Sequence, residues 1–583
     1  MRSPDRMMEG GSGHVATRVY GIVLTLAYGP MIASTWAHWG HARIDCGGAL
    51  DRAARVAAGE ILYRDVQSPY GPVADQVVAA AFRLFGTHLT VAYAVQIVVL
   101  AVASWLLWRI GRRFLCALEC AAAVVGFWVF CGVHPFYLQW LFPNSYAAPF
   151  GATFSLAALA LVLADLERPG THRLAGASLA AALAGLSKIE FGLAAVAVLV
   201  VRVVLFGRAD RSWSRLLVLA FVPGAVLTAA IVLLLLVSVP WPVLLYDNLY
   251  RVRSFAVTVA SLQRFLDRPP WPACLDALVH YGLLLPLWAA AVGVSLHLAR
   301  ARGLRRGLGV VLIPLILGFM LSRWDRSPID FNPVYYVTSW FFEWTTIGWG
   351  LVAVGQLISD RTRRRPETPA VVLAAIYSVV VTLRWKLHVV WPEYYAPLAP
   401  LLLIFIVRTL ATRLVGATAP TATALVFLVA LVPNAYVAWI LAASRDTLLD
   451  YPRGQLWTSR ADDAGLAEVV DWLRANTTPD EYVSVIPEER LINFLAERRN
   501  PTPDAGIGPG WLVTPEDRQG FLTTLAARRT RAVVISNRVY GEFGEGMIGD
   551  YAPEIDYWVR HTCQRVLRTG MFMVFDCRRA FAR

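Results

Sequence analysis

The stretch "IDCGGALDRAARVAAGEILYRDVQSPYGPV", residues 44–73, is dense in charged side chains and ends in a Pro-Tyr-Gly-Pro turn. It lies between two apolar runs, 16–35 and 89–108. Each run is long enough to cross a bilayer, because a spanning helix needs roughly 20 mostly apolar residues. The charges therefore belong to a loop that joins two membrane spans, and the rest of the chain has to explain why they gather there.

The composition predicts a membrane protein. The chain has 583 residues, of which 57% are apolar, whereas ordinary soluble domains are about 45–50% apolar. Residues 1–441 contain 36 Lys and Arg against 21 Asp and Glu, and residues 442–583 contain 18 against 20. The excess positive charge thus belongs to the membrane part, where short cytoplasmic loops collect it. This distribution argues against a nucleic-acid partner.

Apolar runs predict thirteen spans. The pair around "GLSKIEFG" (185–192) is short, so a broken or re-entrant pair stays open there. The predicted spans are 16–35, 89–108, 114–133, 148–164, 174–187, 191–206, 216–239, 279–299, 308–321, 337–358, 370–383, 396–411 and 421–441.

The arginines predict the orientation. The basic segments 109–113, 207–215, 300–307 and 360–365 all fall on one side of the predicted membrane. That side should be cytoplasmic, because cytoplasmic loops are enriched in Lys and Arg. With an odd number of spans, the flexible N-terminus 1–14 lies inside, and both the first external loop 36–88 and residues 442–583 lie outside. Arginine usage and topology indicate a multi-pass protein of the bacterial inner (plasma) membrane.

Residues 442–583 alternate between helical and strand patterns, which predicts a small α/β domain. Helices are expected over 464–476, 487–499 and 517–529, and strands over 482–486, 532–536 and 571–577. Cys563 and Cys577 can pair if this domain faces an oxidising compartment, and the sequence leaves that open.

Asp45 follows the first span directly and is expected near the outer membrane boundary. A partly buried carboxylate there can accept a proton from a hydroxyl group, or bind a divalent cation. The plain alternative is a solvated loop aspartate. The following segment, 47–60, predicts a short amphipathic helix along the interface, with Leu50, Ala53, Ala54 and Ala57 on its apolar face. A second apolar-faced helix is expected over 73–86.

The Asp after the first span and the segment "AAGEILYRDVQSPYGPV" (57–73) resemble the first external loop of membrane-embedded glycosyltransferases with the GT-C fold. Thirteen spans followed by an extracytoplasmic domain are similar to the bacterial branch related to lipid A aminoarabinose transferases and protein mannosyltransferases. The resemblance implies an α-helical polytopic fold with a catalytic transmembrane domain over 15–441, and Asp45 as the catalytic residue. Many members carry a second acidic residue where this chain has Cys46, which puts a two-carboxylate metal site in doubt. No cofactor is required, and a divalent cation stays open.

The same resemblance implies a set of residues that bind the phosphate or sugar of the donor. Each has a plain alternative: Lys188 and Glu190 can lie together at the interface, 246–256 can form an interfacial helix, and the aromatic residues can serve packing. The implied residues are Tyr63, Arg64, Asp65, Tyr70, Lys188, Glu190, Asn248, Arg251, Lys386, His388, Glu393, Tyr394 and Tyr395.

These features predict an inverting glycosyltransferase that moves a sugar from a polyprenyl-phosphate donor to a glycan, lipid or protein hydroxyl on the outer face, with membrane lipids as its surroundings. A transporter or flippase of a lipid-linked saccharide is the main alternative, but no internal repeat of the kind that many transporters have is visible. A membrane scaffold would leave the charges of the first loop unexplained. The sequence identifies neither the sugar nor the acceptor.

Overall fold

The computed structural model places the greater part of the chain. It describes residues 12–40, 42–133, 139–206, 212–245, 284–317, 350–351, 353–356, 358–359, 368–388, 397–415, 420–460, 464–503, 507, 515–539 and 547–581.

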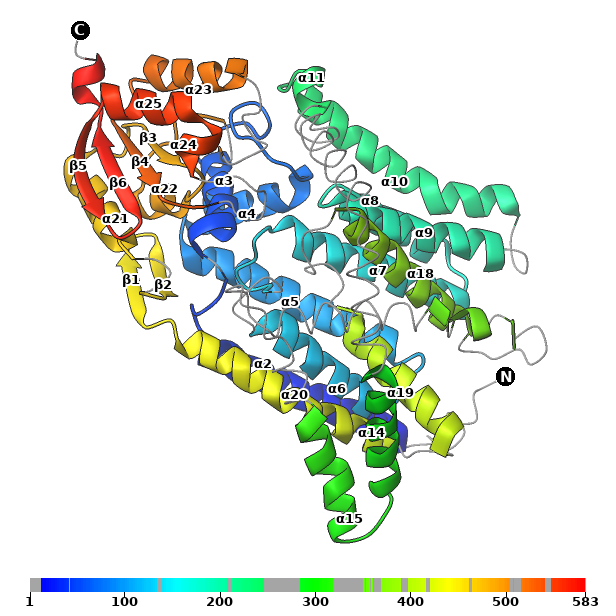
Figure 1. Ribbon diagram of the computed structural model, residues 1–583. Helices are drawn as coiled ribbons and strands as arrows, with labels where there is room; N and C mark the ends of the chain where they lie inside the picture. The colour runs from blue at the N-terminus through cyan, green and yellow to red at the C-terminus, as the bar shows by residue number, and fades with distance from the viewer. Residues whose placement is uncertain are drawn as a thin grey trace.

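Residues before 444 form a bundle of apolar helices, with two shorter helices, α3 and α4, at one end of it (Figure 1). The helices are α2 (Ser12–Ser34), α3 (Gly47–Ala57), α4 (Pro72–Phe85), α5 (Leu89–Gly111), α6 (Ala117–Phe127), α7 (Ala147–Glu167), α8 (Thr171–Gly185), α9 (Ile189–Phe206), α10 (Trp213–Leu236), α11 (Trp241–Leu244), α14 (Leu284–Leu298), α15 (Leu304–Gly307), α18 (Thr368–His388), α19 (Ala399–Val415) and α20 (Pro420–Ala443).

The longer helices coincide with the predicted spans wherever the structure describes them. Among the described residues, the helices α5, α7, α9, α10 and α20 are long and apolar enough to cross a membrane. The predicted span 337–358 lies largely outside the described residues, so the total of thirteen stays a prediction. The two short runs around 185–192 form separate helices, α8 and α9, which pack against each other. A Cβ on Gly192 would lie 2.4 Å from Gly185 Cα, so the glycine pair permits this close approach.

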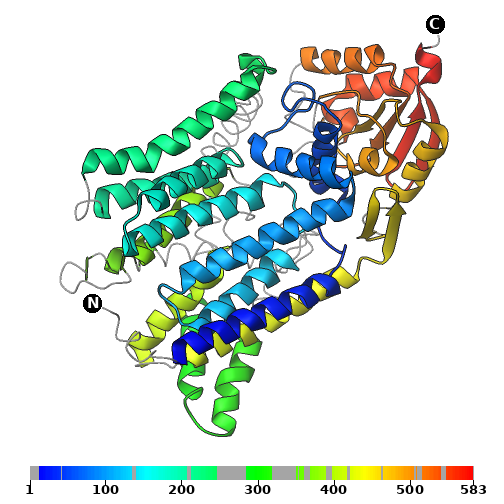
Figure 2. The same cartoon turned by 180° about the vertical axis from the view of Figure 1, so that it is seen from behind.

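Two contacts show which segments lie at each end of the bundle. The amide of Leu89, at the start of α5, donates to the Arg453 carbonyl of the C-terminal domain at 2.7 Å. At the opposite end of the bundle, Arg113 after α5 pairs with Glu167 at the end of α7, at 2.9 Å. Figures 1 and 2 show α3, α4 and the C-terminal domain together at one end, with α15 far from them at the other.

The C-terminal part is a small α/β domain, as predicted. Its four-stranded sheet has the order β3-β4-β6-β5, with β3 parallel to β4 and the other pairs antiparallel. A separate antiparallel pair, β1 with β2, leads from α20 into the domain. The elements are β1 (Thr447–Tyr451), β2 (Gly454–Thr458), α21 (Leu466–Asn476), β3 (Val483–Ile486), α22 (Leu491–Ala496), α23 (Pro515–Ala527), β4 (Ala532–Ser536), α24 (Ile548–Tyr551), α25 (Pro553–Thr562), β5 (Gln564–Thr569) and β6 (Phe572–Asp576).

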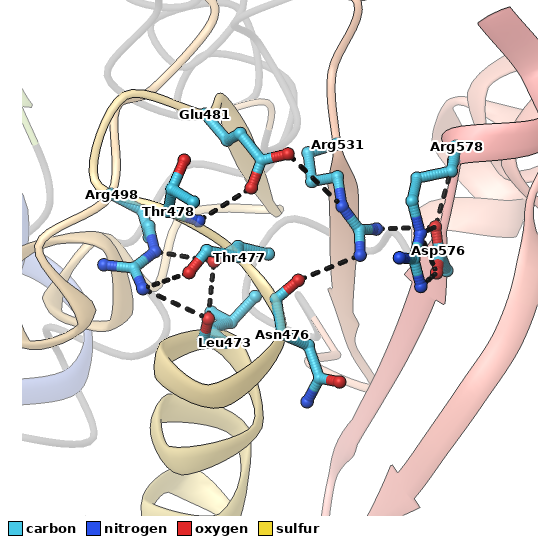
Figure 3. Close-up of polar contacts among 9 residues, drawn as sticks. All are labelled: Leu473, Asn476, Thr477, Thr478, Glu481, Arg498, Arg531, Asp576 and Arg578. Atoms are coloured by element: carbon cyan, nitrogen blue, oxygen red, sulfur yellow. Dashed lines mark hydrogen bonds and ion pairs between the residues drawn. The ribbon is translucent and has the colours of Figure 1, made fainter. Parts of the chain in front are cut away.

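Two arginines contact the end of α21 (Figure 3). Arg498 donates to the Leu473 and Thr477 carbonyls. Arg531, next to β4, donates to the Asn476 carbonyl at 2.9 Å and pairs with Asp576 of β6 at 2.6 Å. Cys563 and Cys577 form a disulfide that joins the end of α25 to the end of β6.

The first loop is more deeply enclosed than an interfacial helix would be. α3 forms with Leu50, Ala53 and Ala54 buried, as its pattern predicts, but its polar residues Asp51 and Arg52 are buried too. The reason is that α4 and α22 both pack against α3. The C-terminal domain therefore covers a helix that we expected to lie along the membrane surface.

Candidate active site

The Pro-Tyr-Gly-Pro turn of the first loop lies against the turn that joins α8 to α9. The amide of Gly71 donates to the Ser187 carbonyl at 3.1 Å, and the amide of Val73 donates to the Leu186 carbonyl at 3.2 Å. A Cβ on residue 71 would lie 2.0 Å from the Leu186 carbonyl oxygen, so only glycine fits here. The structure thus brings together the two motifs, "SPYGP" and "GLSKIEFG", that the sequence singles out separately.

Lys188 and Tyr70 are the side chains that meet at this contact. Lys188 Nζ lies 4.7 Å from the centre of the Tyr70 ring and 3.8 Å from Glu190 Oε1. The side chains of Lys188 and Glu190 are only 6% and 10% exposed. A cation in such surroundings interacts more strongly with a negative charge than it would in water. This arrangement suits the binding of a phosphate, with Glu190 as the internal counter-ion.

A buried ion pair supports Tyr70 from the other side. Arg52 Nε donates to Asp75 Oδ2 at 2.8 Å, and Ser68 Oγ donates to the same oxygen at 3.0 Å. The Arg52 guanidinium lies 5.9 Å from the centre of the Tyr70 ring. Burial acts to lower the pKa of Arg52, but the Asp75 carboxylate outweighs it and leaves the pKa above its usual value. The sequence does not reveal this pair, because Arg52 lies off the apolar face of the predicted helix and its partner follows 23 residues later.

Asp45 lies in a π-helical turn, Ala42–Cys46, directly before α3. Its side chain is exposed, so the partial burial that we expected is absent. Cys46 beside it is buried, and its thiol donates to the Phe142 carbonyl at 3.1 Å and to Asn144 Oδ1 at 3.4 Å. Cys46 thus anchors the Asp45 segment to the loop that precedes α7.

Tyr63, Arg64 and Asp65 shape the loop between α3 and the Tyr70 turn. Tyr63 is buried and donates through its hydroxyl to the Tyr70 carbonyl at 2.8 Å. Arg64 and Asp65 pair at 2.8 Å at the surface, and the hydrogen bond from Arg64 lowers the pKa of Asp65. Asp65 also accepts from the Ile61 amide. These contacts give the three residues a local structural role that the sequence motif did not reveal.

Of the other predicted donor-site residues, two lie within a helix that the structure describes. Lys386 and His388 belong to the last turn of α18, a helix that packs against α9. In the described part of the chain, no three His, Cys, Asp or Glu residues are grouped so that they could hold a metal ion. Outside the described residues lie Asn248, Arg251, Glu393, Tyr394 and Tyr395.

Residues 68–242 match the model of the family described as dolichyl-phosphate-mannose-protein mannosyltransferase. The match begins at Ser68, the first residue of the "SPYGP" turn, and includes Lys188 and Glu190. The predicted resemblance is confirmed. The chain is accordingly a membrane enzyme of the glycosyltransferase class, which uses polyprenyl-phosphate-linked sugars. No curated protein matches it in sequence.

Solved structures of two such enzymes are similar in arrangement over nearly the whole chain. ArnT from Cupriavidus metallidurans, bound to undecaprenyl phosphate, has 15% sequence identity and a TM-score of 0.45, covering 97% of this chain and 98% of its own. The Archaeoglobus fulgidus oligosaccharyltransferase, in complex with Zn and sulfate, has 14% identity and a TM-score of 0.49, covering 92% of this chain and 71% of its own.

Proposed function

We propose that this glycosyltransferase transfers a sugar, with inversion at the anomeric carbon, from a polyprenyl-phosphate donor to an acceptor hydroxyl outside the cytoplasm. The observation that carries the proposal is the contact between Lys188 and Tyr70. It places a nearly buried cation at the junction of the first loop and the α8–α9 turn, within the segment that matches the mannosyltransferase family.

In the proposed reaction, Asp45 accepts the proton of the acceptor hydroxyl as its oxygen attacks the anomeric carbon. The new carbon–oxygen bond forms while the bond from that carbon to the phosphate oxygen breaks, and the electron pair leaves with the lipid phosphate. Lys188 stabilises the charge that develops on this phosphate. The exposure of Asp45 suits a base that must reach a bulky acceptor. No step requires a metal ion, because Asp45 takes up the proton and Lys188 stabilises the charge on the phosphate.

The outward location of the reaction belongs to the same proposal. The Cys563–Cys577 disulfide supports it, because disulfides form and persist mainly in oxidising compartments such as the bacterial periplasm. The distribution of arginines supports the same orientation. A lipid-linked donor fits this location, since nucleotide sugars are not supplied outside the cytoplasm.

The test compares Asp45→Asn with the unchanged chain in cells that lack the native protein. We expect Asp45→Asn to lose the surface glycan that mass spectrometry detects with the unchanged chain, by about 100-fold or more, as for the removal of a general base. Purified Asp45→Asn should still bind undecaprenyl phosphate, because the Lys188 site is intact. Asp446→Asn is the matched control, since Asp446 is an exposed carboxylate outside the site. Normal glycan yield from Asp45→Asn would contradict the proposed base and favour a flippase.

A further inference from the structure

The C-terminal domain holds both ends of the segment that begins at Asp45. At the far end of α3, Arg55 Nη1 donates to the Thr502 carbonyl at 3.1 Å. At the near end, Arg43, in the same turn as Asp45, contacts Met571 Sδ at 2.8 Å. Between them, α22 packs against α3 and against the turn Ala42–Cys46. Contacts from separate parts of one domain therefore fix this segment along its length.

The Arg55 side chain joins α3, the loop 60–67 and the C-terminal domain. Besides Thr502, it binds Glu60 Oε2 at 2.7 Å and the Asp65 carbonyl at 2.8 Å. The loop it holds makes a second contact with the domain, where the Gln67 amide donates to the Pro503 carbonyl at 2.8 Å. The planar fork of arginine carries five donors in fixed directions, so it can bind all three acceptors at once. Arg55 thus couples α3, the loop 60–67 and the C-terminal domain.

Buried charge shows that this interface is closely packed. Asp51 of α3 and Arg490 next to α22 are only 6% and 2% exposed. Burial raises the pKa of Asp51, and the charges of Arg55, Arg490 and Arg453 oppose this; the last two arginines belong to the C-terminal domain. Polar and charged groups are costly to bury, so they are enclosed only where the surrounding structure is fixed. A loosely tethered domain would leave them in water.

The end of the loop that contains Tyr70 is held by contacts outside the C-terminal domain. Tyr70 and Gly71 lie against the α8–α9 turn through the Gly71–Ser187 and Val73–Leu186 hydrogen bonds, which do not involve the C-terminal domain. Loosening Arg55 should therefore free the loop 60–67 from the C-terminal domain, while the Arg52–Asp75 pair and the two turn contacts keep Tyr70 beside Lys188.

We propose that the C-terminal domain positions Asp45 for the reaction, with Arg55 as the positioning residue that connects them. This inference rests on the proposed role of Asp45 as the base. It assigns the domain a part in the transfer step that is separate from donor binding, and it names Arg55 as a residue outside the Lys188 site on which turnover depends.

The test is Arg55→Lys in the full-length protein, with Arg113→Lys as the matched control. Arg113 binds Glu167 through two nitrogens, is 11% exposed where Arg55 is 10%, and lies at the opposite end of the bundle. In Arg55→Lys we expect faster hydrogen exchange of the Gln67 amide and a surface glycan yield per folded protein about 10- to 100-fold lower, as for a misplaced catalytic group. The Kd for undecaprenyl phosphate should stay within about twofold. Arg113→Lys should match the unchanged chain in all three measurements.

Three results would overturn the inference. Unchanged hydrogen exchange of the Gln67 amide would show that Arg55 does not hold the loop. An unchanged glycan yield would show that the position of the loop does not affect the transfer step. Equal losses of glycan and of undecaprenyl phosphate binding would show a general structural role instead. The base proposal fails separately, through full glycan yield in Asp45→Asn, whereas Gln67 exchange reports on the contact whatever the base is.

Discussion

At the scale of single residues, the Arg52–Asp75 ion pair is the support on which the Tyr70 turn rests. The two side chains are 7% and 3% exposed, and they join α3 to α4 directly beneath the ring that contacts Lys188. Removing one member of a buried pair leaves the other charged and without compensation, which costs far more than the pair contributes by itself. Replacing Arg52 alone, and replacing Arg52 and Asp75 together, should therefore have very different effects on the free energy of unfolding.

We predict that Arg52→Met lowers the free energy of unfolding by about 3 to 5 kcal/mol, because Asp75 stays buried without its cation. The double variant Arg52→Met with Asp75→Leu should recover most of this loss, since a buried pair can be replaced by apolar side chains at little cost. Thermal unfolding of the purified protein in detergent measures both. Arg560→Met, which removes a surface pair within α25, should change stability by about 0.5 kcal/mol or less. A double variant as unstable as Arg52→Met would contradict this account.

Some residues of the candidate site could be predicted from the sequence and others could not. Lys188 could be predicted because an ionisable residue between apolar runs is costly and usually functional. Tyr70 could be predicted from its turn motif. Arg52, Asp75 and Arg55 could not, because their partners depend on how α3 crosses α4 and the C-terminal domain, and no local spacing encodes that crossing. The exposure of Asp45 agrees with the alternative of a solvated loop aspartate, which the sequence left open.

At the scale of elements, the close contact of two turns organises the site. Gly71 precedes α4, and its lack of a side chain lets the first loop approach the α8–α9 turn. A Cβ on Gly48, within α3, would meet no other atom within 4 Å, so that glycine serves no comparable purpose. The chain therefore offers a matched pair of glycines, one at a close contact and one in open space.

We predict that Gly71→Ala lowers Tm and weakens binding of undecaprenyl phosphate, because the new methyl group would force the turn away from Leu186 and separate Tyr70 from Lys188. Gly48→Ala should instead stabilise the protein by up to about 1 kcal/mol, since alanine favours a helix over glycine. Thermal unfolding and a binding titration measure both variants. Undecaprenyl phosphate binding that survives Gly71→Ala would show that the contact of the two turns is not needed for the donor phosphate.

The hydropathy pattern predicted the long apolar helices and the buried strands well, and the short or exposed elements poorly. The apolar helices and strands β3, β4 and β6 agree with their patterns, because burial on all sides requires continuous apolar runs. Strand β5 was missed, since most of its residues are exposed and its sequence "QRVLRT" shows little alternation. Helix α22 is shorter than its predicted range 487–499, because Glu497 ends it in a left-handed conformation with φ of 59°. The β1–β2 pair was also not predicted.

At the scale of the whole molecule, the bundle has two chemically different ends. One end carries the first loop, the α8–α9 turn and the C-terminal domain, and the other carries the arginine-rich turn before α15 (Figure 2). The proposed reaction belongs to the first of these ends, and therefore to one side of the membrane only. The distribution of arginines predicts which side that is, and the arrangement of the helices is consistent with it.

We predict that Gly520→Cys in α23 reacts with a membrane-impermeant maleimide in intact cells, whereas Arg302→Cys reacts only after the membrane is permeabilised. Both positions are exposed, so the difference between them depends on the side of the membrane and not on burial. Both variants are made in a parent chain in which Cys116 and Cys274 are replaced by serine. Its background labelling should be low, because the other free cysteines that the structure describes, Cys46, Cys120 and Cys131, are buried. The reverse pattern of labelling would place Asp45 and Lys188 on the cytoplasmic side, where the proposed outward transfer could not occur.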